Sequence, residues 1–253
     1  MIKAELAGRA ILVTGASSGI GLASVRLLAG CGARVALNYL PDDPRGPAQV
    51  AALRAEGLDV VAAPGDVSSR AEAERMVTTA IETLGRLDHL VNNAGTAHVK
   101  EPVDIRDLDA VTDELWDAVL ATNLRGTFAC SRAAATALKA AKGGITSIAS
   151  VAGLSQPGSS MAYGASKAGV ISLTRNLARS LAPDVRVNAI APGLVLTPWT
   201  APWPETRKSG SAEAALLKRN CTPEDIAEAV LFFVAGAAMV TGQVLVVDGG
   251  RVL

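Results

Sequence analysis

The feature that most constrains the fold is a glycine-punctuated segment near the N-terminus, Thr14-Gly15-Ala16-Ser17-Ser18-Gly19-Ile20-Gly21. The apolar residues 10–13 before it are typical of a buried parallel strand, and residues 22–28 after it follow a helical pattern. A strand, a glycine-rich turn and a helix in this order can place backbone N–H groups around a phosphate. The segment therefore predicts α/β structure with an anion site at this turn.

Each glycine of the segment has an expected geometric role. Gly15 permits the tight turn, Gly19 lets backbone N–H groups approach phosphate oxygens, and Gly21 lets the helix lie close to the sheet. The positive end of the helix dipole adds to the attraction. The spacing is GxxxGxG rather than GxGxxG, and the chain has 24 glycines, so an ordinary glycine-rich turn is the alternative. The flanking strand and helix favour a dinucleotide site.

The rest of the chain alternates apolar runs with helical patterns, which predicts a Rossmann-like, doubly wound α/β fold: a mostly parallel sheet with helices on both faces. Seven strands are expected near residues 9–14, 34–38, 59–63, 87–92, 144–149, 185–190 and 243–247. Such sheets bind ligands at the carboxyl ends of their strands. Gly15, Asn92, Ser150 and Pro192 each lie just past an expected strand end, so the motifs should converge on one edge.

A second motif, Tyr163-Gly164-Ala165-Ser166-Lys167, lies far downstream and is preceded by Ser150. Hydride addition to a carbonyl builds charge on the oxygen, so a proton source must lie within about 3 Å of it. Tyrosine has an ordinary pKa of about 10, and Lys167, one helical turn further, would favour the phenolate. Ser150 could give the substrate oxygen a second hydrogen bond. A solvated helix pair is the alternative, but the serine and the upstream loop favour catalysis.

With these residues, the chain resembles the classical short-chain dehydrogenase/reductase family along essentially its whole length. The matches are, in chain order, the cofactor loop Thr14 to Gly21, the adenine-contacting Asp66 and Val67, the strand-closing Asn92, Asn93, Ala94 and Gly95, the catalytic tetrad Asn123, Ser150, Tyr163 and Lys167, and the nicotinamide-contacting Pro192, Gly193, Val195 and Thr197. The resemblance implies an NAD(P)-dependent oxidoreductase acting on a carbonyl or secondary alcohol. Within the family the chain is most similar to 3-oxoacyl-carrier-protein reductases. A sugar or polyol dehydrogenase is the enzymatic alternative, and a catalytically silent cofactor-binding regulator is the alternative from another class.

Two of the matched residues have structural alternatives. The resemblance implies that Asn123 holds a water that links Lys167 to solvent, but Asn123 lies in a helical pattern where it could simply bond to the backbone. Asp66 could cap a helix that begins around Ser68, because Asp, Ser and Asn are common at that position.

The end of the second strand, residues 35–40, should decide between NADP and NAD. An acidic side chain there binds the ribose of NAD and repels the 2′-phosphate of NADP, whereas this chain has Asn38. Asn38, the loop serines and Arg45 could bond a phosphate. The apolar Leu40 and the acidic residues 42–43 argue against it. The pattern favours NADP(H) and leaves NAD(H) open.

The loop after Gly193 holds Trp199 and Trp203, two of three tryptophans in a chain with 3% aromatic residues. They could line a pocket for a hydrophobic substrate, next to Ser150 and Tyr163, or they could anchor the loop on the core. We expect residues 194–211 to form a mobile lid that leads to a helix near residue 212. His98 could reach the substrate but is more typical of a surface side chain. Residues 100–113 form a longer segment than is usual in the family.

Composition and charge exclude several classes of function. The 24 basic and 24 acidic residues balance and are interspersed, so nucleic acid and anionic membranes are not expected partners. Three widely separated cysteines and two histidines predict neither a disulfide framework nor a metal site. The apolar run at residues 229–240 is shorter than the roughly 18 residues of a membrane span.

Length and patterning predict one domain over residues 1–253. The three widely separated cysteines are typical of reduced structural thiols, so we expect a cytoplasmic protein. Charges within residues 1–6 argue against a signal peptide. The family resemblance implies a homodimer or homotetramer assembled through long helices near residues 113–140 and 160–182.

Overall fold

A computed structural model describes residues 4–253. The expectation that residues 1–6 are not a signal peptide concerns a segment that lies partly outside this range. The described chain forms a sheet of seven strands in the order β3-β2-β1-β4-β5-β6-β7. The strands are β1 (Ala10–Val13), β2 (Arg34–Tyr39), β3 (Val60–Pro64), β4 (His89–Asn92), β5 (Gly144–Ile148), β6 (Arg186–Pro192) and β7 (Val244–Val247). Every strand pairing is parallel. The predicted Rossmann-like sheet is confirmed.

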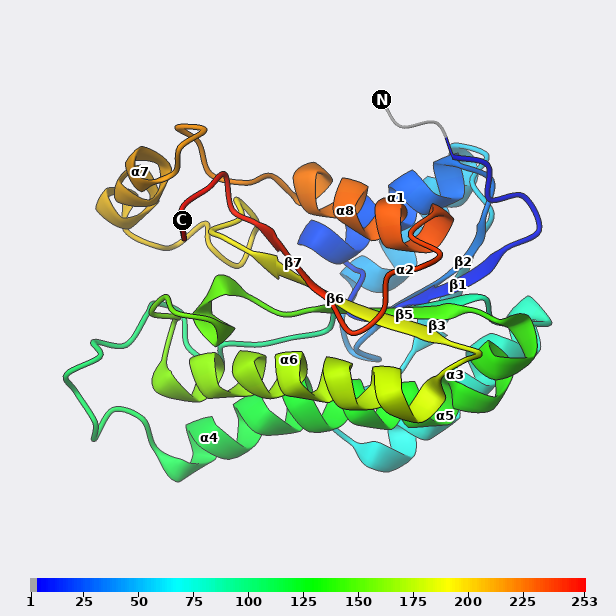
Figure 1. Cartoon of the computed structure of the whole chain (residues 1–253), viewed down its shortest axis with the longest axis horizontal. Coiled ribbons are helices and arrows are strands. Elements are labelled where there is room, and N and C mark those ends of the chain that lie inside the picture. The colour runs from blue at the N-terminus through cyan, green and yellow to red at the C-terminus, as the bar shows by residue number, and fades with distance from the viewer. Residues whose placement is uncertain (1–3) are drawn as a thin grey trace.

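Helices cover both faces of the sheet (Figure 1). One layer contains α1 (Gly19–Gly30), α2 (Arg45–Ala55) and α8 (Pro223–Ala235). The other contains α3 (Arg70–Leu84), α4 (Asp113–Leu120), α5 (Thr127–Ala141) and α6 (Met161–Leu181). A separate helix, α7 (Glu205–Ala214), lies beyond one end of the sheet, beside the C-terminus (Figure 1).

Two apolar cores hold the helical layers to the sheet. β1 supplies both of them, because its side chains alternate between the two faces: Ile11 and Val13 pack toward α1 and α8, and Ala10 and Leu12 pack toward α3, α5 and α6. All four residues of β1 are buried, as the apolar run predicts for a central parallel strand.

The site lies where the strand order reverses. The chain builds β1, β2 and β3 to one side and then returns to place β4 on the other side of β1. The chain continues from β1 into α1 on one face of the sheet and from β4 into α4 on the other, and such a reversal point is where open α/β sheets bind ligands.

The predicted long helices are confirmed with one interruption. Residues 161–181 form α6, close to the expected range. Between α4 and α5 the helix widens into a π-helical turn at Ala121–Gly126, which no periodic pattern announces. Among residues 4–253, no helix is long and apolar enough to cross a bilayer.

Candidate active site

A cavity of about 910 Å³ opens at the carboxyl ends of the strands. Nearly all the predicted site residues line it, and they are Gly15, Ser17, Ser18, Gly19, Ile20, Asn38, Asp66, Val67, Asn93, Ala94, Gly95, Ser150, Tyr163, Lys167, Pro192, Gly193, Val195, Thr197, Trp199 and Trp203. Gly21 and Asn123 lie behind the wall and support it. The motifs that follow different strands therefore meet in one cavity, as the sequence led us to expect.

The glycine-rich turn packs tightly against the end of β4. Gly15 has a φ of +60°, and a Cβ added to it would lie 2.6 Å from the Cα of Ala94, so only glycine fits there. A Cβ on Gly21 would lie 2.6 Å from the carbonyl oxygen of Gly15, so this glycine lets α1 approach the loop rather than the sheet. The turn leaves the N-terminus of α1 open to the cavity, which is the cradle that a pyrophosphate needs.

Asn93 braces this cradle with its side chain. Its amide donates hydrogen bonds to the carbonyl oxygens of Thr14 and Gly15 at 2.9 and 2.8 Å. The Thr14 hydroxyl in turn accepts the N–H groups of Asn93 and Ala94, both at 3.0 Å. Asn93 thus holds the loops after β1 and β4 together, and its amide nitrogen is occupied by these contacts.

Asn38 does not present its side chain to the cofactor as expected. The side chain is buried, and its Oδ1 accepts the Gly15 N–H at 3.0 Å. Its Nδ2 donates to the carbonyl oxygens of Ala63 and Gly65 at 2.9 and 3.0 Å. All the amide hydrogens are used inside the protein, so Asn38 shapes the cradle and cannot donate to a 2′-phosphate.

The groups that face the cavity near β2 are instead an acid and a base. Asp43 accepts a hydrogen bond from Ser17 Oγ at 2.7 Å and pairs with Arg45 at 2.8 Å. The hydrogen bond from Arg45 lowers the pKa of Asp43 to about 2, so this carboxylate is charged at neutral pH. Leu40 lines the same end of the cavity.

Asp66 forms a turn rather than a helix cap. Its carboxylate accepts the backbone N–H and the hydroxyl of Ser68 at 2.8 and 2.7 Å. The helix expected around Ser68 begins at Arg70, with Ser69 as its N-cap. The capping alternative was therefore wrong, because the N-cap lies three residues after Asp66, and Asp66 remains at the cavity wall.

Tyr163, Ser150 and Lys167 line the same cavity. Ser150 follows β5, and its Oγ accepts the N–H of Ala152 at 3.1 Å. The Lys167 ammonium lies 5.6 Å from the centre of the Tyr163 ring and donates to the carbonyl oxygen of Ile148 at 2.8 Å. The shared helix face predicted for Tyr163 and Lys167 is thus present, and β5 carries the serine to it.

The pKa values in this cluster differ from the expected direction. Burial raises the pKa of Tyr163 to about 12, and a hydrogen bond with Ser150 opposes this only in part. Burial also lowers the pKa of Lys167 to about 8. The sequence led us to expect that Lys167 would lower the pKa of the tyrosine, but desolvation sets the direction of the shift. Tyr163 is therefore a neutral phenol at pH 7, able to donate a proton.

Asn123 lies in the π-helical turn and is buried. Its Oδ1 accepts the N–H of Thr96 at 2.8 Å, and its Nδ2 donates to the Thr96 carbonyl oxygen and to Ser166 Oγ, both at 3.0 Å. A Cβ on Gly95 would lie 3.4 Å from both Asn123 Oδ1 and Lys167 Nζ. The structural role considered for Asn123 is present, and it places this residue beside Lys167.

The two tryptophans come from the connection after β6. Trp199 meets the Tyr163 ring edge to face, with ring centres 5.7 Å apart, and both rings line the cavity. Trp203 packs under the Arg207 guanidinium at 4.9 Å. This connection contains α7 from Glu205 onward, so the expected helix start near residue 212 was wrong.

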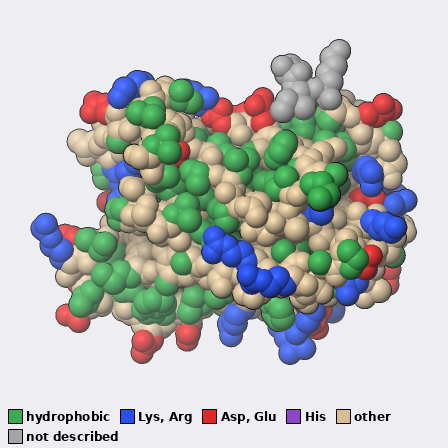
Figure 2. Space-filling model, in the orientation of Figure 1, with side chains coloured by type: hydrophobic (Ala, Val, Ile, Leu, Met, Phe, Trp, Pro, Cys, Tyr) green, Lys and Arg blue, Asp and Glu red, His purple; other side chains and the backbone are tan. Residues whose placement is uncertain are grey.

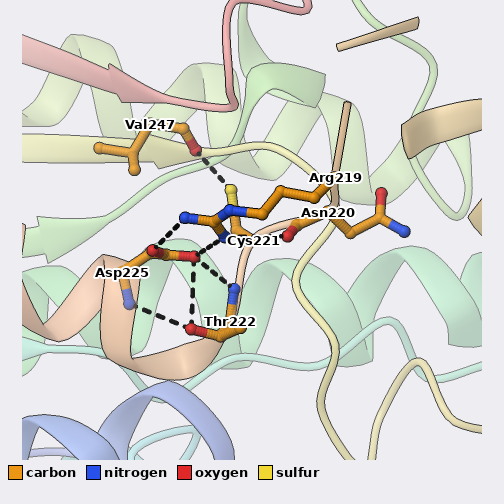
Figure 3. Close-up of polar contacts among 6 residues, drawn as sticks. All are labelled: Arg219, Asn220, Cys221, Thr222, Asp225 and Val247. Carbon is orange, nitrogen blue, oxygen red and sulfur yellow. Dashed lines mark hydrogen bonds and ion pairs between the residues drawn. The ribbon is translucent and has the colours of Figure 1, made fainter. Parts of the chain in front are cut away.

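Both ends of this connection are anchored to the body of the protein. Val195 pairs as an isolated bridge with Cys221, whose Sγ donates to the carbonyl oxygen of Val247 at 3.4 Å (Figure 3). Arg219 forms an ion pair with Asp225 in the first turn of α8 (Figure 3). The connection is thus held at both ends, and Arg207 also ties its middle to the carbonyl oxygen of Gly158.

Sequence reasoning missed several residues of the wall. Gln156 to Ser159, Arg207 and Arg251 line the cavity but belong to no recognised motif. His98, expected mainly as a surface residue, is exposed and also lines the cavity. The segment at residues 100–112 forms no helix or strand, and its Val103 N–H donates to the carbonyl oxygen of Ser159 at 2.8 Å. Only the tertiary fold brings these distant segments to the catalytic end.

A comparison with protein families matches residues 15–251 to a family model described as enoyl-(acyl carrier protein) reductase. A candidate ketoacyl reductase of the granaticin polyketide synthase from Streptomyces violaceoruber is 43% identical over 246 residues, covering 94% of each chain. A 3-oxoacyl-[acyl-carrier-protein] reductase from Synechocystis is 36% identical over 256 residues, covering 98% of each.

Solved structures agree with these relatives. A short-chain dehydrogenase from Burkholderia cenocepacia, determined in complex with NADP, superposes with a TM-score of 0.88 at 33% identity and covers 98% of this chain and 99% of its own. The parallel sheet, the cavity and these matches together place the chain in the short-chain dehydrogenase/reductase family, among oxidoreductases that act on carbonyl and CH–OH groups.

Proposed function

We propose that the protein reduces a ketone with NADPH, and that Asn123, Ser150, Tyr163 and Lys167 perform the chemistry. The observation that carries this proposal is that a glycine-lined cradle and a Ser150–Tyr163–Lys167 cluster line one cavity. The cradle fits a dinucleotide because it is glycine-lined and opens at the N-terminus of α1. A 3-oxoacyl thioester or another hydrophobic ketone is the proposed substrate, as the names of the two curated relatives suggest.

The chemistry follows from the side chains. A bound nicotinamide supplies hydride to the carbonyl carbon. Ser150 and Tyr163 donate hydrogen bonds to the carbonyl oxygen, and Tyr163 transfers its proton there as charge develops. Lys167 stabilises the phenolate that is left and passes a proton to it, and a proton from solvent then restores the Lys167 ammonium, with Asn123 fixing the surrounding backbone. At neutral pH the buried Tyr163 is a neutral phenol, which carries the proton that a reduction consumes.

NADP(H) is the proposed cofactor, with Arg45 rather than Asn38 as the group that meets the 2′-phosphate. Arg45 lines the cavity beside Asp43, and the solved relative from Burkholderia cenocepacia holds NADP. The adenine end would lie along Asp66 and Val67, and the nicotinamide end along Pro192, Gly193, Val195 and Thr197.

The proposed enzyme is a single catalytic domain with a lid near residues 194–211, acting in the cytoplasm as a dimer or tetramer. Phe128 on α5 and Met161 on α6 are exposed apolar side chains on the helices expected to assemble it. Phe232 on α8 and Leu245 and Val246 on β7 are exposed as well. Figure 2 shows apolar side chains among the polar ones on one face of the molecule. Light scattering on the purified protein would measure the oligomeric state.

The test is Tyr163→Phe, which removes the proton source and keeps the ring. We expect turnover of NADPH with a 3-oxoacyl thioester to fall by about 10²- to 10⁴-fold, with the dissociation constant for NADPH retained. A panel of hydrophobic ketones and of polyols with NADP⁺ identifies the substrate class. Near-normal turnover in the variant would remove Tyr163 from the mechanism. NADPH binding without turnover of any substrate would support the regulatory alternative.

A further inference from the structure

Two arginines line the catalytic end of the cavity without any role in the mechanism above. Arg207 comes from α7, and Arg251 comes from the segment after β7. Figure 1 shows α7 and the C-terminus at the same end of the molecule. Both side chains are partly buried.

Neither arginine forms an ion pair with a carboxylate of residues 4–253. Arg207 donates one hydrogen bond, to the carbonyl oxygen of Gly158 at 3.0 Å, and Arg251 donates one, to Ser211 Oγ at 3.0 Å. A guanidinium has five N–H donors, so each arginine keeps donors that these contacts do not use.

The two charges also destabilise one another. Burial and then the nearby charge of Arg251 lower the pKa of Arg207. Partly desolvated like charges without a counterion are costly, and an anion between them would relieve both the repulsion and the desolvation. The arrangement is therefore complementary to a negatively charged group.

The arginines lie close to the proposed proton donor. A Cβ on Gly158 would lie 2.8 Å from Cδ1 of Tyr163, and Arg207 bonds to that same glycine. Trp203, under the Arg207 guanidinium, also lines the cavity together with Trp199. Arg207 therefore lies at the same end of the cavity as Tyr163.

We infer that the substrate carries an anionic oxygen group, a carboxylate or a phosphate, which Arg251 and Arg207 bind while its carbonyl lies at Tyr163. Guanidinium groups bind such oxygens through paired, charge-assisted hydrogen bonds. This inference rests on the proposed ketone reductase and specifies its substrate.

The competing explanation is that the two arginines only tether α7. Under that explanation Arg251 matters because it bonds to Ser211, so Ser211→Ala, which removes the same hydrogen bond and keeps the charge, should reproduce the effect of Arg251→Gln. Anion binding predicts the opposite, because only the arginine variant removes the charge.

The experiment compares substrates that differ only in charge. The probes are 4-oxopentanoate against its carboxamide, and acetoacetyl-coenzyme A against the acetoacetyl thioester of N-acetylcysteamine, which lacks the phosphates. We expect the ratio of kcat/KM for charged over neutral probe to exceed one in the wild type for one pair. In Arg251→Gln this ratio should fall by about 10- to 150-fold, as for one charge-assisted hydrogen bond. The pair that responds identifies carboxylate or phosphate.

Ser211→Ala and Arg75→Gln are the matched controls, since Arg75 is an exposed arginine of α3 outside the cavity. Both should keep the wild-type ratio. Equal kcat/KM for charged and neutral probes in the wild type, an unchanged ratio in Arg251→Gln, or a fall of the ratio in Ser211→Ala would each overturn the inference.

A binding measurement separates this inference from the proposed function. If no ketone is reduced, the proposed function fails, and titration of 4-oxopentanoate and of coenzyme A against tryptophan fluorescence still tests the arginines. Binding that weakens at least 10-fold in Arg251→Gln, and not in Arg75→Gln, supports the anion site. Absence of binding, or equal binding by both variants, refutes it.

Discussion

Asn38→Asp is the substitution that most sharply tests how the cofactor site is built. It changes one buried amide nitrogen to an oxygen and alters the shape of the side chain very little. If Asn38 faced the cofactor ribose, the new carboxylate would shift preference from NADPH to NADH and leave stability intact. The structure predicts a different outcome, because the amide joins Gly15 to the carbonyl oxygens of Ala63 and Gly65.

The expected loss of stability follows from these three contacts. The substitution removes both hydrogen bonds from Nδ2 and places carboxylate oxygens against two carbonyl oxygens at a position that is 2% exposed. The two lost hydrogen bonds amount to about 2 kcal/mol, and an unpaired buried charge costs about 3–5 kcal/mol in total. For a chain of this size we expect the melting temperature to fall by about 6–20 °C.

The defect should depend on pH in a defined direction. Burial beside carbonyl oxygens raises the pKa of the introduced carboxyl in the folded protein above its unfolded value of about 3.9. The unfolded chain therefore loses the proton first as pH rises, and the variant becomes less stable through this range. Relative to wild type, the variant should be less impaired at pH 5 than at pH 8.

Urea unfolding followed by tryptophan fluorescence at both pH values measures the free energy of unfolding. Asn176→Asp is the control, since Asn176 is an exposed residue of α6 that donates only to the Ser172 carbonyl oxygen. It should change stability by less than about 0.5 kcal/mol. A variant at position 38 that is as stable as wild type and prefers NADH would refute the structural role of Asn38.

Three further predictions concern the catalytic lysine, the cofactor and the lid. Because the pKa of Lys167 is about 8, the rate of reduction should fall as the pH rises through this value and the ammonium loses its proton. A pH–rate profile without this fall would show that the charge of Lys167 does not contribute to the rate. Arg45→Ala should raise the Michaelis constant for NADPH about 10-fold and that for NADH much less, whereas equal changes would show that Arg45 only holds Asp43. Hydrogen exchange should be faster in residues 196–211 than in β1 and β4, and Trp203→Ala should raise the Michaelis constant of a bulky ketone more than that of a small one. Protection equal to that of the central strands would make this segment a fixed wall instead of a lid.

Local patterns carried most of the fold. Buried parallel strands are continuous apolar runs, and the glycine-rich turn after β1 has few conformations available, so these elements follow from residues close together in the sequence. The pairing of Tyr163 with Lys167 follows from helical periodicity, and Ser150 from its place after a strand. These contacts needed no knowledge of distant segments.

What the tertiary structure decided depends on segments far apart in the chain. The sequence alone determined a doubly wound sheet and the convergence of its motifs, because both arise from local periodicity and strand direction. Only the fold showed that Asn38 is used by Gly15, Ala63 and Gly65, that burial rather than Lys167 controls the pKa of Tyr163, and that Arg207 and Arg251 meet at one cavity. Hydrogen-bond partners, desolvation and charge pairs depend on spatial neighbours, and a one-dimensional pattern carries no information about neighbours that lie tens of residues away.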